Sequence, residues 1–145
     1  ILDYLEKEEN YIPDIVLQLR PTQPLRKVED IDECLDIFIQ NKGKYDSLRS
    51  VVKFEKSPYK MYSVEGKELI PLFKEINGIK EPYNECRQHL PDTYLQGGYI
   101  DIFNSEIVRK GTISGDRVYP YVLENEEIVD IDTIEDWEKA EKLLS

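Results

Sequence analysis

Two aspartates near the end of the chain have the residue type and the spacing that suit metal chemistry. Asp130 and Asp132 stand two residues apart in the stretch EEIVDIDTIEDWEKAEKLL, where valine and isoleucine alternate with acidic residues. This alternation predicts a strand that ends on the two aspartates. In an extended chain, residues i and i+2 project from the same face, roughly 6.5 Å apart. Two such carboxylates can bind one hard cation, with Mg²⁺ the usual candidate. The alternative is a solvated acidic turn.

A helix is expected directly after the two aspartates. Thr133 is predicted to be its N-cap, and Asp136, three residues later, completes a variant capping box. Trp137, Ala140 and Leu144 follow at helical spacing, and Trp137 is expected to pack in the core. The two carboxylates are therefore predicted at a junction of strand and helix.

A second group of polar residues lies in a proline-rich loop. The residues from Pro13 to Leu19 predict a buried strand, and the loop RPTQPLR follows it, with Arg20, Thr22 and Arg26. In open α/β sheets, ligands bind at the carboxyl ends of strands. Two arginines there can grip carboxylate or phosphate oxygens in bidentate fashion. The alternative is a surface loop with ordinary charges.

The elements around this loop predict an α/β fold with a parallel sheet. Apolar residues recur at helical spacing from Val28 to Phe38, and a second strand is expected from Ser47 to Phe54. Strand, helix and strand in this order are typical of a βαβ unit. A further strand is expected from Tyr94 to Phe103, and a short helix from Ser105 to Lys110.

The middle of the chain interrupts this pattern. Residues 55–91 are rich in proline, tyrosine, glycine and lysine, which predicts an insertion of irregular structure and short strands. Lys60, Arg87 and Gln88 are its candidate polar ligands, and His89 is expected to be an ordinary surface residue. Five of the ten tyrosines cluster around it, at 59, 62, 83, 94 and 99. Exposed aromatics suit a protein interface, and the alternative is a small local core.

Composition narrows the function classes. A chain of 145 residues with 40% hydrophobic and 34% charged residues predicts one domain with a real core. The net charge of −11 disfavours nucleic acid and anionic membranes as partners, and no apolar run is long enough to cross a bilayer. Cys34 and Cys86 are expected to be reduced, with Cys34 buried, which favours the cytoplasm. The first residues, ILDYLEKEE, read as a helix already under way, so we expect a piece of a longer polypeptide.

Four stretches together resemble the acylneuraminate cytidylyltransferases, which are the CMP-sialic acid synthetases and their relatives for other nine-carbon keto-sugar acids. The matching stretches, which follow the family's order over nearly the whole chain, are DIVLQLRPTQPLR, SPYKMY, RQHLPDTYLQGGYIDI and VDIDTIEDWEKAEKLL. The resemblance implies a Rossmann-like sheet flanked by helices in a single partial domain, residues 1–145. It also implies an inserted dimerisation region at about residues 55–100. The family's opening strand and Gly/Arg/Ser/Lys-rich loop, which hold the nucleotide, have no counterpart before Ile1.

The resemblance also implies a reaction. The anomeric hydroxyl of the sugar acid attacks the α-phosphate of CTP, and pyrophosphate leaves. Asp130 and Asp132 would be the catalytic pair that ligates Mg²⁺ beside the phosphates. The helix that begins at Thr133 would favour phosphate oxygens near its N-terminus. A homodimer is expected, and this piece of the enzyme alone is expected to be inactive.

The substrate residues implied by the resemblance come from the loop, the insertion and the following strand. They are Arg20, Thr22, Arg26, Lys60, Arg87, Gln88, Gln96 and Gly97. Lys60 and Arg87 would serve the partner's site across the dimer. Arg20 stands where many relatives carry Gln, Gly97 where sialic acid enzymes carry Asn, and Asp101 where an aromatic hydroxyl is common. These departures favour another sugar, such as a legionaminate-like or pseudaminate-like acid.

Two alternatives stay open at this level. One is a relative that uses another nucleotide, such as GTP, because the base-reading residues of the family lie in the part that has no counterpart here. The other is a catalytically inert fragment or dimerisation module.

Overall fold

A computed structural model describes residues 1–123 and 129–144 of the chain. The chain divides into two compact units. The first, which we call the sheet unit, combines Ile1–Val52 with Gln96–Ser145. The second, which we call the insert unit, is Lys53–Leu95. The sequence-based expectation had placed the insertion at about residues 55–100.

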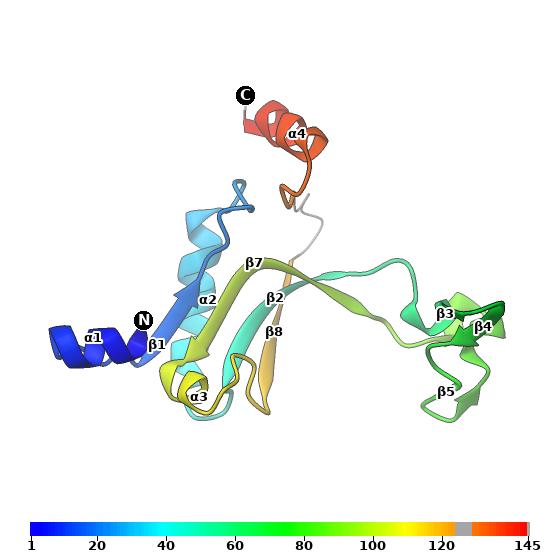
Figure 1. Cartoon of the computed structure of the whole chain (residues 1–145), viewed down its shortest axis with the longest axis horizontal. Coiled ribbons are helices and arrows are strands. Elements are labelled where there is room, and N and C mark those ends of the chain that lie inside the picture. The colour runs from blue at the N-terminus through cyan, green and yellow to red at the C-terminus, as the bar shows by residue number, and fades with distance from the viewer. Residues whose placement is uncertain (124–128, 145) are drawn as a thin grey trace. The chain divides into compact units, whose positions relative to one another are not determined.

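The sheet unit contains a four-stranded mixed sheet in the order β1-β7-β2-β8 (Figure 1). The strands are β1 (Ile15–Gln18), β2 (Ser47–Lys53), β7 (Tyr94–Asn104) and β8 (Val118–Leu123). β1 pairs with β7 in antiparallel fashion, whereas β2 pairs with β8 in parallel. The mixed α/β class is therefore confirmed, but the prediction of a parallel sheet is wrong. The strand β7 lies between β1 and β2, the two strands of the expected βαβ unit.

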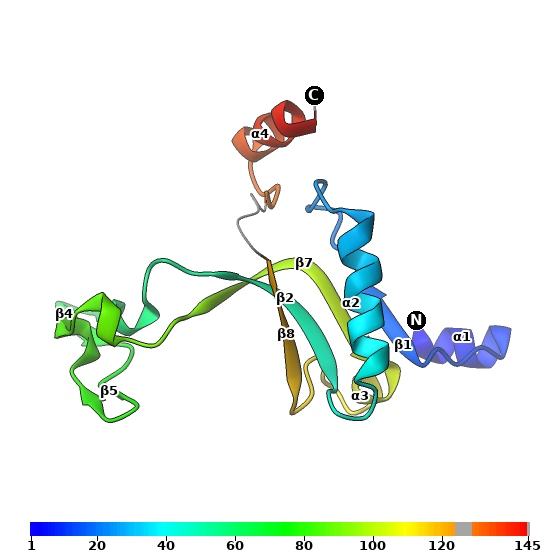
Figure 2. The same ribbon diagram turned by 180° about the vertical axis from the view of Figure 1, so that it is seen from behind.

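Helix α2 (Val28–Gln40) covers one face of this sheet (Figure 2). Its apolar spacing turns Cys34 and Phe38 into the core, where they join Leu48, Ile100 and Ile102. Two acidic residues in its first turn, Glu29 and Asp30, complement the helix dipole. Burying a large apolar side chain stabilises a fold by about 1.5–3 kcal/mol, so this cluster anchors the unit.

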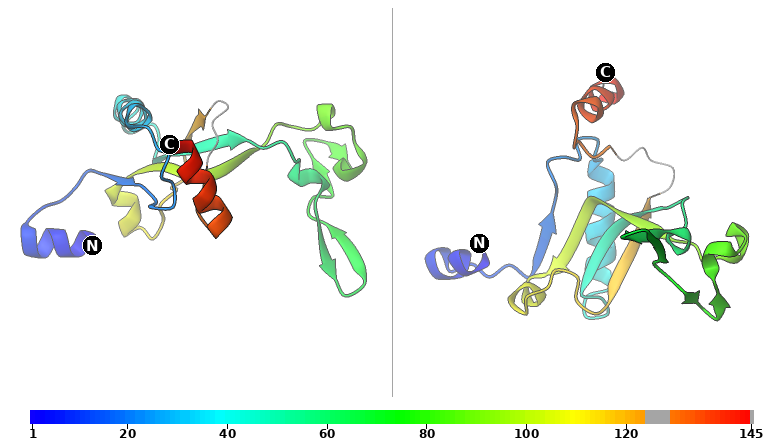
Figure 3. Two further views of the ribbon diagram at one scale, coloured as in Figure 1. Left: turned by 90° about the horizontal axis from the view of Figure 1, so that it is seen from above. Right: turned by 45° about the vertical axis from the view of Figure 1, so that its right-hand side comes forward.

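The remaining helices of the sheet unit are α1 (Leu2–Glu9), α3 (Ser105–Arg109) and α4 (Ile134–Leu144). Figure 3 (left) shows α2 and α3 on opposite sides of the sheet. Helix α1 buries none of its residues. No helix in the described residues is both long and apolar enough to cross a bilayer.

The sequence-based expectation missed β8 and placed a strand further along the chain. Pro120 lies within β8, and proline argues against a central strand because it lacks an N–H donor. The strand order resolves this, since β8 lies at the end of the sheet and has one neighbour. Part of the expected strand, residues 126–128, falls outside the described residues. Its end, from Val129 to Asp132, belongs to no strand, so that part of the prediction is wrong.

The insert unit consists of two small antiparallel ribbons and three 3₁₀ turns. The first ribbon pairs β3 (Tyr62–Glu65) with β4 (Glu68–Pro71), and the second pairs β5 (Glu75–Ile76) with β6 (Ile79–Lys80). The turns are η1 (Pro58–Lys60), η2 (Pro82–Asn84) and η3 (Arg87–His89). Short strands and irregular structure were expected here, and both are confirmed.

Few side chains are buried within the insert unit, all of whose residues are described. Pro82 and Leu90 are its only buried residues. Aromatic rings supply much of the remaining packing, with centroids 5.2 Å apart for Tyr59 and Phe73 and 5.6 Å apart for Tyr62 and Tyr83. The unit therefore holds a small aromatic cluster rather than a layered core.

Candidate functional site

The proline-rich loop after β1 lies against the beginning of β7. Gln23 is buried, and its Nε2 donates a hydrogen bond of 2.8 Å to the carbonyl oxygen of Gly97. The Nε of Arg26 donates to the carbonyl oxygen of Tyr99, and its Nη2 donates to the carbonyl oxygen of Arg20 at 2.9 Å. The bonds to Gly97 and Tyr99 join residues more than seventy positions apart and give the loop a defined position on the sheet.

Tyr99 anchors the other end of this loop. Its hydroxyl donates to Asp30 at 2.7 Å and accepts from the backbone N–H of Lys27 at 2.8 Å. The guanidinium of Arg26 lies over its ring, 5.7 Å from the centroid, and burial lowers the pKa of Arg26. Tyr99 is 3% exposed, so this one of the five clustered tyrosines is a core residue and not a surface aromatic. Arg26 therefore holds the loop in place.

Arg20 has a different environment from Arg26. Its guanidinium forms one ion pair among the described residues, with Asp101 at 4.0 Å, and its side chain is 45% exposed. It occupies the space next to Gly98, whose φ is +66°; a Cβ added there would come within 2.7 Å of the Arg20 guanidinium. Gln96 donates to the other oxygen of Asp101 at 3.3 Å. Arg20, Gln96 and Asp101 therefore form one polar cluster beside Gly98.

The acidic segment before α4 meets the same loop. The backbone N–H of Ile131 donates to the carbonyl oxygen of Thr22 at 2.9 Å, so Asp130 and Asp132 flank a residue that contacts the arginine-bearing loop. Asp130 is half-buried, and its Oδ1 is shielded from solvent without a hydrogen-bond partner among the described residues. Asp132 is exposed.

The predicted capping box at the start of α4 is confirmed. Thr133 Oγ1 accepts from the backbone N–H of Asp136 at 3.2 Å, and the Asp136 carboxylate accepts from the N–H of Thr133 at 2.9 Å. The hydrogen bonds from Thr133 lower the pKa of Asp136. The box fixes the first turn of α4. The segment that carries Asp130 and Asp132 therefore ends at Thr133, directly before the helix.

Trp137 does not pack in the core, and that prediction is wrong. It is 55% exposed and lines a hollow of about 250 Å³ beside the proline-rich loop. The other lining residues are Pro21, Pro24, Ile131, Ala140, Glu141 and Leu144. Of these helical positions, Ala140 is the buried one. Because α4 packs against a loop and not against a sheet, it buries only a narrow strip of its surface around Ala140. The ring of Trp137 lies at the edge of that strip.

The carboxylates suit a magnesium ion with few protein ligands. The described residues hold no group of three or more His, Cys, Asp or Glu side chains that could bind a metal. Magnesium, however, is often bound by one or two carboxylates together with water and substrate phosphates. The shielded, unpartnered Oδ1 of Asp130 is an atom that such an ion would satisfy. Asp130 therefore fits the role of a ligand, whereas Asp132 is exposed and the strand expected to align the two carboxylates is absent from residues 129–132.

The three expected ligands in the insertion all lie in the insert unit. Lys60 Nζ donates to the carbonyl oxygen of Tyr83 at 3.3 Å, and Arg87 and Gln88 are exposed in η3. Arg87 and Ser57 line a small hollow of about 30 Å³ within this unit. The sheet unit thus brings together the other expected residues, namely Arg20, Thr22, Arg26, Gln96 and Gly97, with the segment of Asp130 and Asp132 beside Thr22.

Three further residues complete the cluster, although the sequence pattern did not select them as ligands. Gln23 and Gly98 position the loop, and Asp101 is the buried partner of Arg20. The double glycine and an acid within an apolar strand were the available signals. These signals point to the cluster only once the fold is known, because the fold places β7 against the proline-rich loop.

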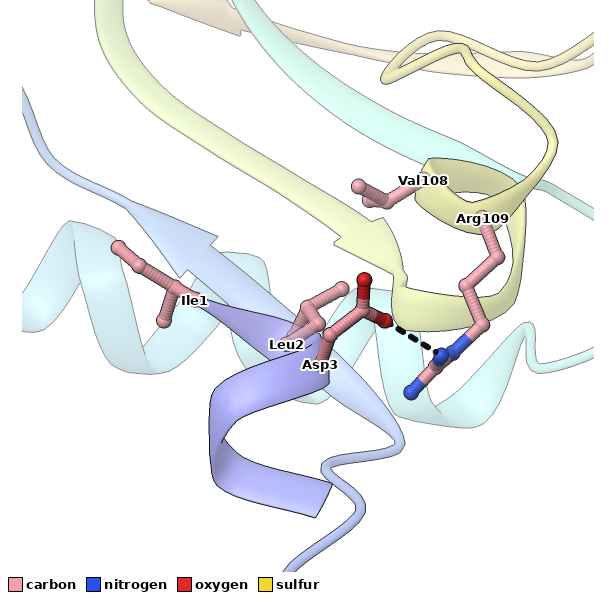
Figure 4. Close-up of a pocket in the computed structure, with 5 residues that line it drawn as sticks. All are labelled: Ile1, Leu2, Asp3, Val108 and Arg109. Carbon is pink, nitrogen blue, oxygen red and sulfur yellow. Dashed lines mark hydrogen bonds and ion pairs between the residues drawn. The ribbon is translucent and has the colours of Figure 1, made fainter. Parts of the chain in front are cut away.

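A separate hollow of about 590 Å³ lies by the first residues of the chain (Figure 4). Ile1, Leu2, Asp3, Val108 and Arg109 line it. Arg109 is already paired with Asp3 at 3.0 Å and with Glu6 at 2.6 Å. This hollow contains none of the residues predicted to bind substrate or metal.

In comparisons with known proteins, no protein-family model and no curated protein matches the chain.

Proposed function

We propose that this chain is part of a cytoplasmic, Mg²⁺-dependent nucleotidyltransferase with a Rossmann-like sheet. The enzyme would activate a nine-carbon keto-sugar acid with CTP to give the CMP-sugar and pyrophosphate. The observation that carries the proposal is the hydrogen bond between Ile131 and Thr22, because it joins the acidic segment to the arginine-bearing loop. A metal-binding pair beside a cationic loop is what a phosphoryl-transfer site requires.

Each predicted site residue of the sheet unit has a role in this proposal. Asp130 and Asp132 would hold Mg²⁺, which supplies shielding of the phosphate charge and lowers the pKa of the attacking hydroxyl when it is bound. Arg20, with its half-exposed guanidinium, would bind an anionic group of the substrate. Thr22, Gln96 and Gly97 would line the sugar, and Arg26 would hold their loop on β7.

The insert unit would complete a homodimer. Lys60, Arg87 and Gln88 are exposed polar groups of that unit, and in the proposed dimer they would reach the partner's sugar acid. Basic residues there are consistent with a substrate that carries a carboxylate. The overall charge of −11 makes such local cations necessary for binding any anion.

Pyrophosphate release from the full-length natural protein tests the proposal. CTP, GTP, UTP and ATP would be paired with N-acetylneuraminate, a legionaminate-like acid and a pseudaminate-like acid. Asp130→Asn and Asp132→Asn are each expected to cut turnover by a factor of about 100 or more, because the metal loses a charged ligand. Asp36→Asn, an exposed aspartate on α2, is the matched control and should keep the wild-type rate.

Wild-type rates in both site variants would remove the metal role. Release with GTP and not CTP would identify the relative that uses another base. A protein that forms dimers but releases no pyrophosphate with any pair would support the second candidate, an inert dimerisation module. The apolar side chains that the insert unit exposes, such as Val64 and Leu69, are the observation that favours it.

A further inference from the structure

Asp101 is a buried carboxylate with weak compensation. Its side chain is 3% exposed, although it lies on β7 within an otherwise apolar run. Removing a carboxylate from water costs several kcal/mol unless charges and hydrogen bonds replace the solvent. Its neighbours are Gln96 at 3.3 Å and Arg20 at 4.0 Å, and neither contact is short. A carboxyl group buried here with so few close partners indicates a role beyond packing.

Arg20 is restrained at its guanidinium by two neighbours and at its backbone by a third. Its guanidinium fills the space where a side chain at 98 would begin, 2.7 Å from an ideal Cβ. Its carbonyl oxygen accepts from Arg26 at 2.9 Å, and its charge faces the Asp101 carboxylate. A free arginine side chain carries about 2 kcal/mol of rotamer entropy, so restraint before binding lowers the cost of gripping a ligand.

The donors of Arg20 remain available, unlike those of Arg26. Arg26 directs its Nε and one Nη to the carbonyl oxygens of Tyr99 and Arg20. Among the described residues, Arg20 directs its guanidinium to Asp101 alone, beyond hydrogen-bond distance, and stays 45% exposed. A guanidinium has five N–H donors in a planar fork that matches two carboxylate oxygens.

We infer that Asp101 is a positioning residue which, together with Gly98, orients the Arg20 guanidinium as the receptor for the carboxylate of the sugar acid. The inference rests on the proposed function for the identity of its ligand. It makes Arg20 the group that distinguishes a sugar acid from a neutral sugar, and it assigns the buried Asp101 the role of orienting Arg20.

Carboxylate binding by the 145-residue chain tests this inference without nucleotide or metal. The probes are N-acetylneuraminate, its uncharged methyl ester and inorganic phosphate. The readout is the arginine Nε–Hε signal of Arg20 in ¹⁵N spectra, assigned by its disappearance in Arg20→Gln. We expect N-acetylneuraminate to shift this signal and to bind at least tenfold more tightly than the ester.

Variants separate positioning from simple charge. In Arg20→Gln the preference for the acid over the ester is expected to vanish. Asp101→Asn should reduce that preference at least threefold in the wild-type background and leave it unchanged in the Arg20→Gln background, because Asp101 acts through Arg20. Gly98→Ala should reduce it as well, since the new methyl group displaces the guanidinium. Arg109→Gln, an arginine in ion pairs elsewhere, is the control and should keep the preference.

Several results would overturn the inference. They are no shift of the Arg20 signal with N-acetylneuraminate or with a legionaminate-like or pseudaminate-like acid, a shift with phosphate alone, and an acid preference that Asp101→Asn leaves unchanged or strengthens. Should Asp101→Asn fail to fold, Asp101→Glu, which keeps the carboxylate and shifts it by one methylene group, decides the same question. Acid-selective binding at Arg20 without pyrophosphate release from the full-length protein would remove the proposed function alone, whereas release without that selectivity would remove the inference alone.

Discussion

The sheet unit and the insert unit of this chain differ in how many side chains they bury. The sheet unit places residues from α2, β2 and β7 in one cluster, with Phe38, Leu48, Ile100 and Ile102 at most 2% exposed. The insert unit buries only Pro82 and Leu90, within 43 fully described residues from Lys53 to Leu95. Its ribbons are two to four residues long, and isolated ribbons of this size are marginally stable in water.

The insert unit also displays apolar side chains on its surface. Val64 is 71% exposed, Leu69 65% and Leu72 53%. Val64 and Leu69 are cross-strand partners of one ribbon and so lie on one face. The contrast is that the sheet unit has a buried apolar cluster of its own, whereas the insert unit buries little and exposes an apolar ribbon face. Such a face suits the contact of the proposed homodimer.

The largest expected effect tests where the stability resides. Ile102→Ala removes a fully buried side chain of the sheet unit and should lower the free energy of unfolding by about 2–5 kcal/mol. Leu69→Ala removes an exposed side chain of the insert unit and should change it by less than about 0.5 kcal/mol. Urea denaturation of both variants at dilute concentration measures the difference. Equal losses would mean that the two units do not differ in the way described.

A second, intermediate effect tests the insert surface as the dimer contact. The wild-type chain is expected to sediment as a dimer at micromolar concentration, and Val64→Asp with Leu69→Asp should weaken the dimer at least tenfold, because unpaired charges would be buried. The control is Lys67→Glu in the turn of the same ribbon, which makes the same change in net charge and should leave the dimer intact. A wild-type monomer, or equal weakening by the control, would count against this surface.

The smallest effect compares the two cysteines, one in each unit. Cys34 is buried, and burial, with smaller contributions from Asp30 and Glu33, raises the pKa of its thiol to about 12. An unfolded thiol titrates near pH 8.5 (about its reference value), so above that pH the unfolded chain loses a proton that the folded chain keeps. Stability should therefore fall by about 1 kcal/mol between pH 8 and pH 9.5.

Cys34→Ala is expected to lose this pH dependence, whereas Cys86→Ala, which alters the exposed thiol of the insert unit, should retain it. Urea melts at the two pH values provide the measurement, and the partial ionisation of tyrosines at pH 9.5 cancels because both variants carry the same tyrosines. A thiol reagent should label one cysteine in the native chain and both in denaturant. Rapid native labelling at Cys34 would show that the sheet unit opens more readily than its packing indicates.

Much of the secondary structure could be predicted from the sequence because it is encoded by near neighbours. The helix α2 follows from apolar spacing, and the α4 start follows from the pair Thr133 and Asp136. Strands β1, β2 and β7 follow from β-branched runs, with boundaries within two residues of those expected. The residues proposed for the sheet-unit site were also selected locally, as polar groups next to strand or helix ends.

The pairing of these elements depended on contacts between residues far apart in the chain. The position of β7 between β1 and β2, the use of Arg26 to hold the loop, and the ion pair of Arg20 with Asp101 all depend on contacts distant in the chain. Ser50 of β2 lies fifty residues from Ile100 of β7, and Arg26 and Arg20 lie more than seventy residues from Tyr99 and Asp101. No local period encodes such contacts, because packing and desolvation act on whatever residues the completed fold brings together. The amino-acid pattern therefore specified which residues carry charge and which form helices and strands, while the folded arrangement determined which arginine holds the scaffold and which one faces solvent.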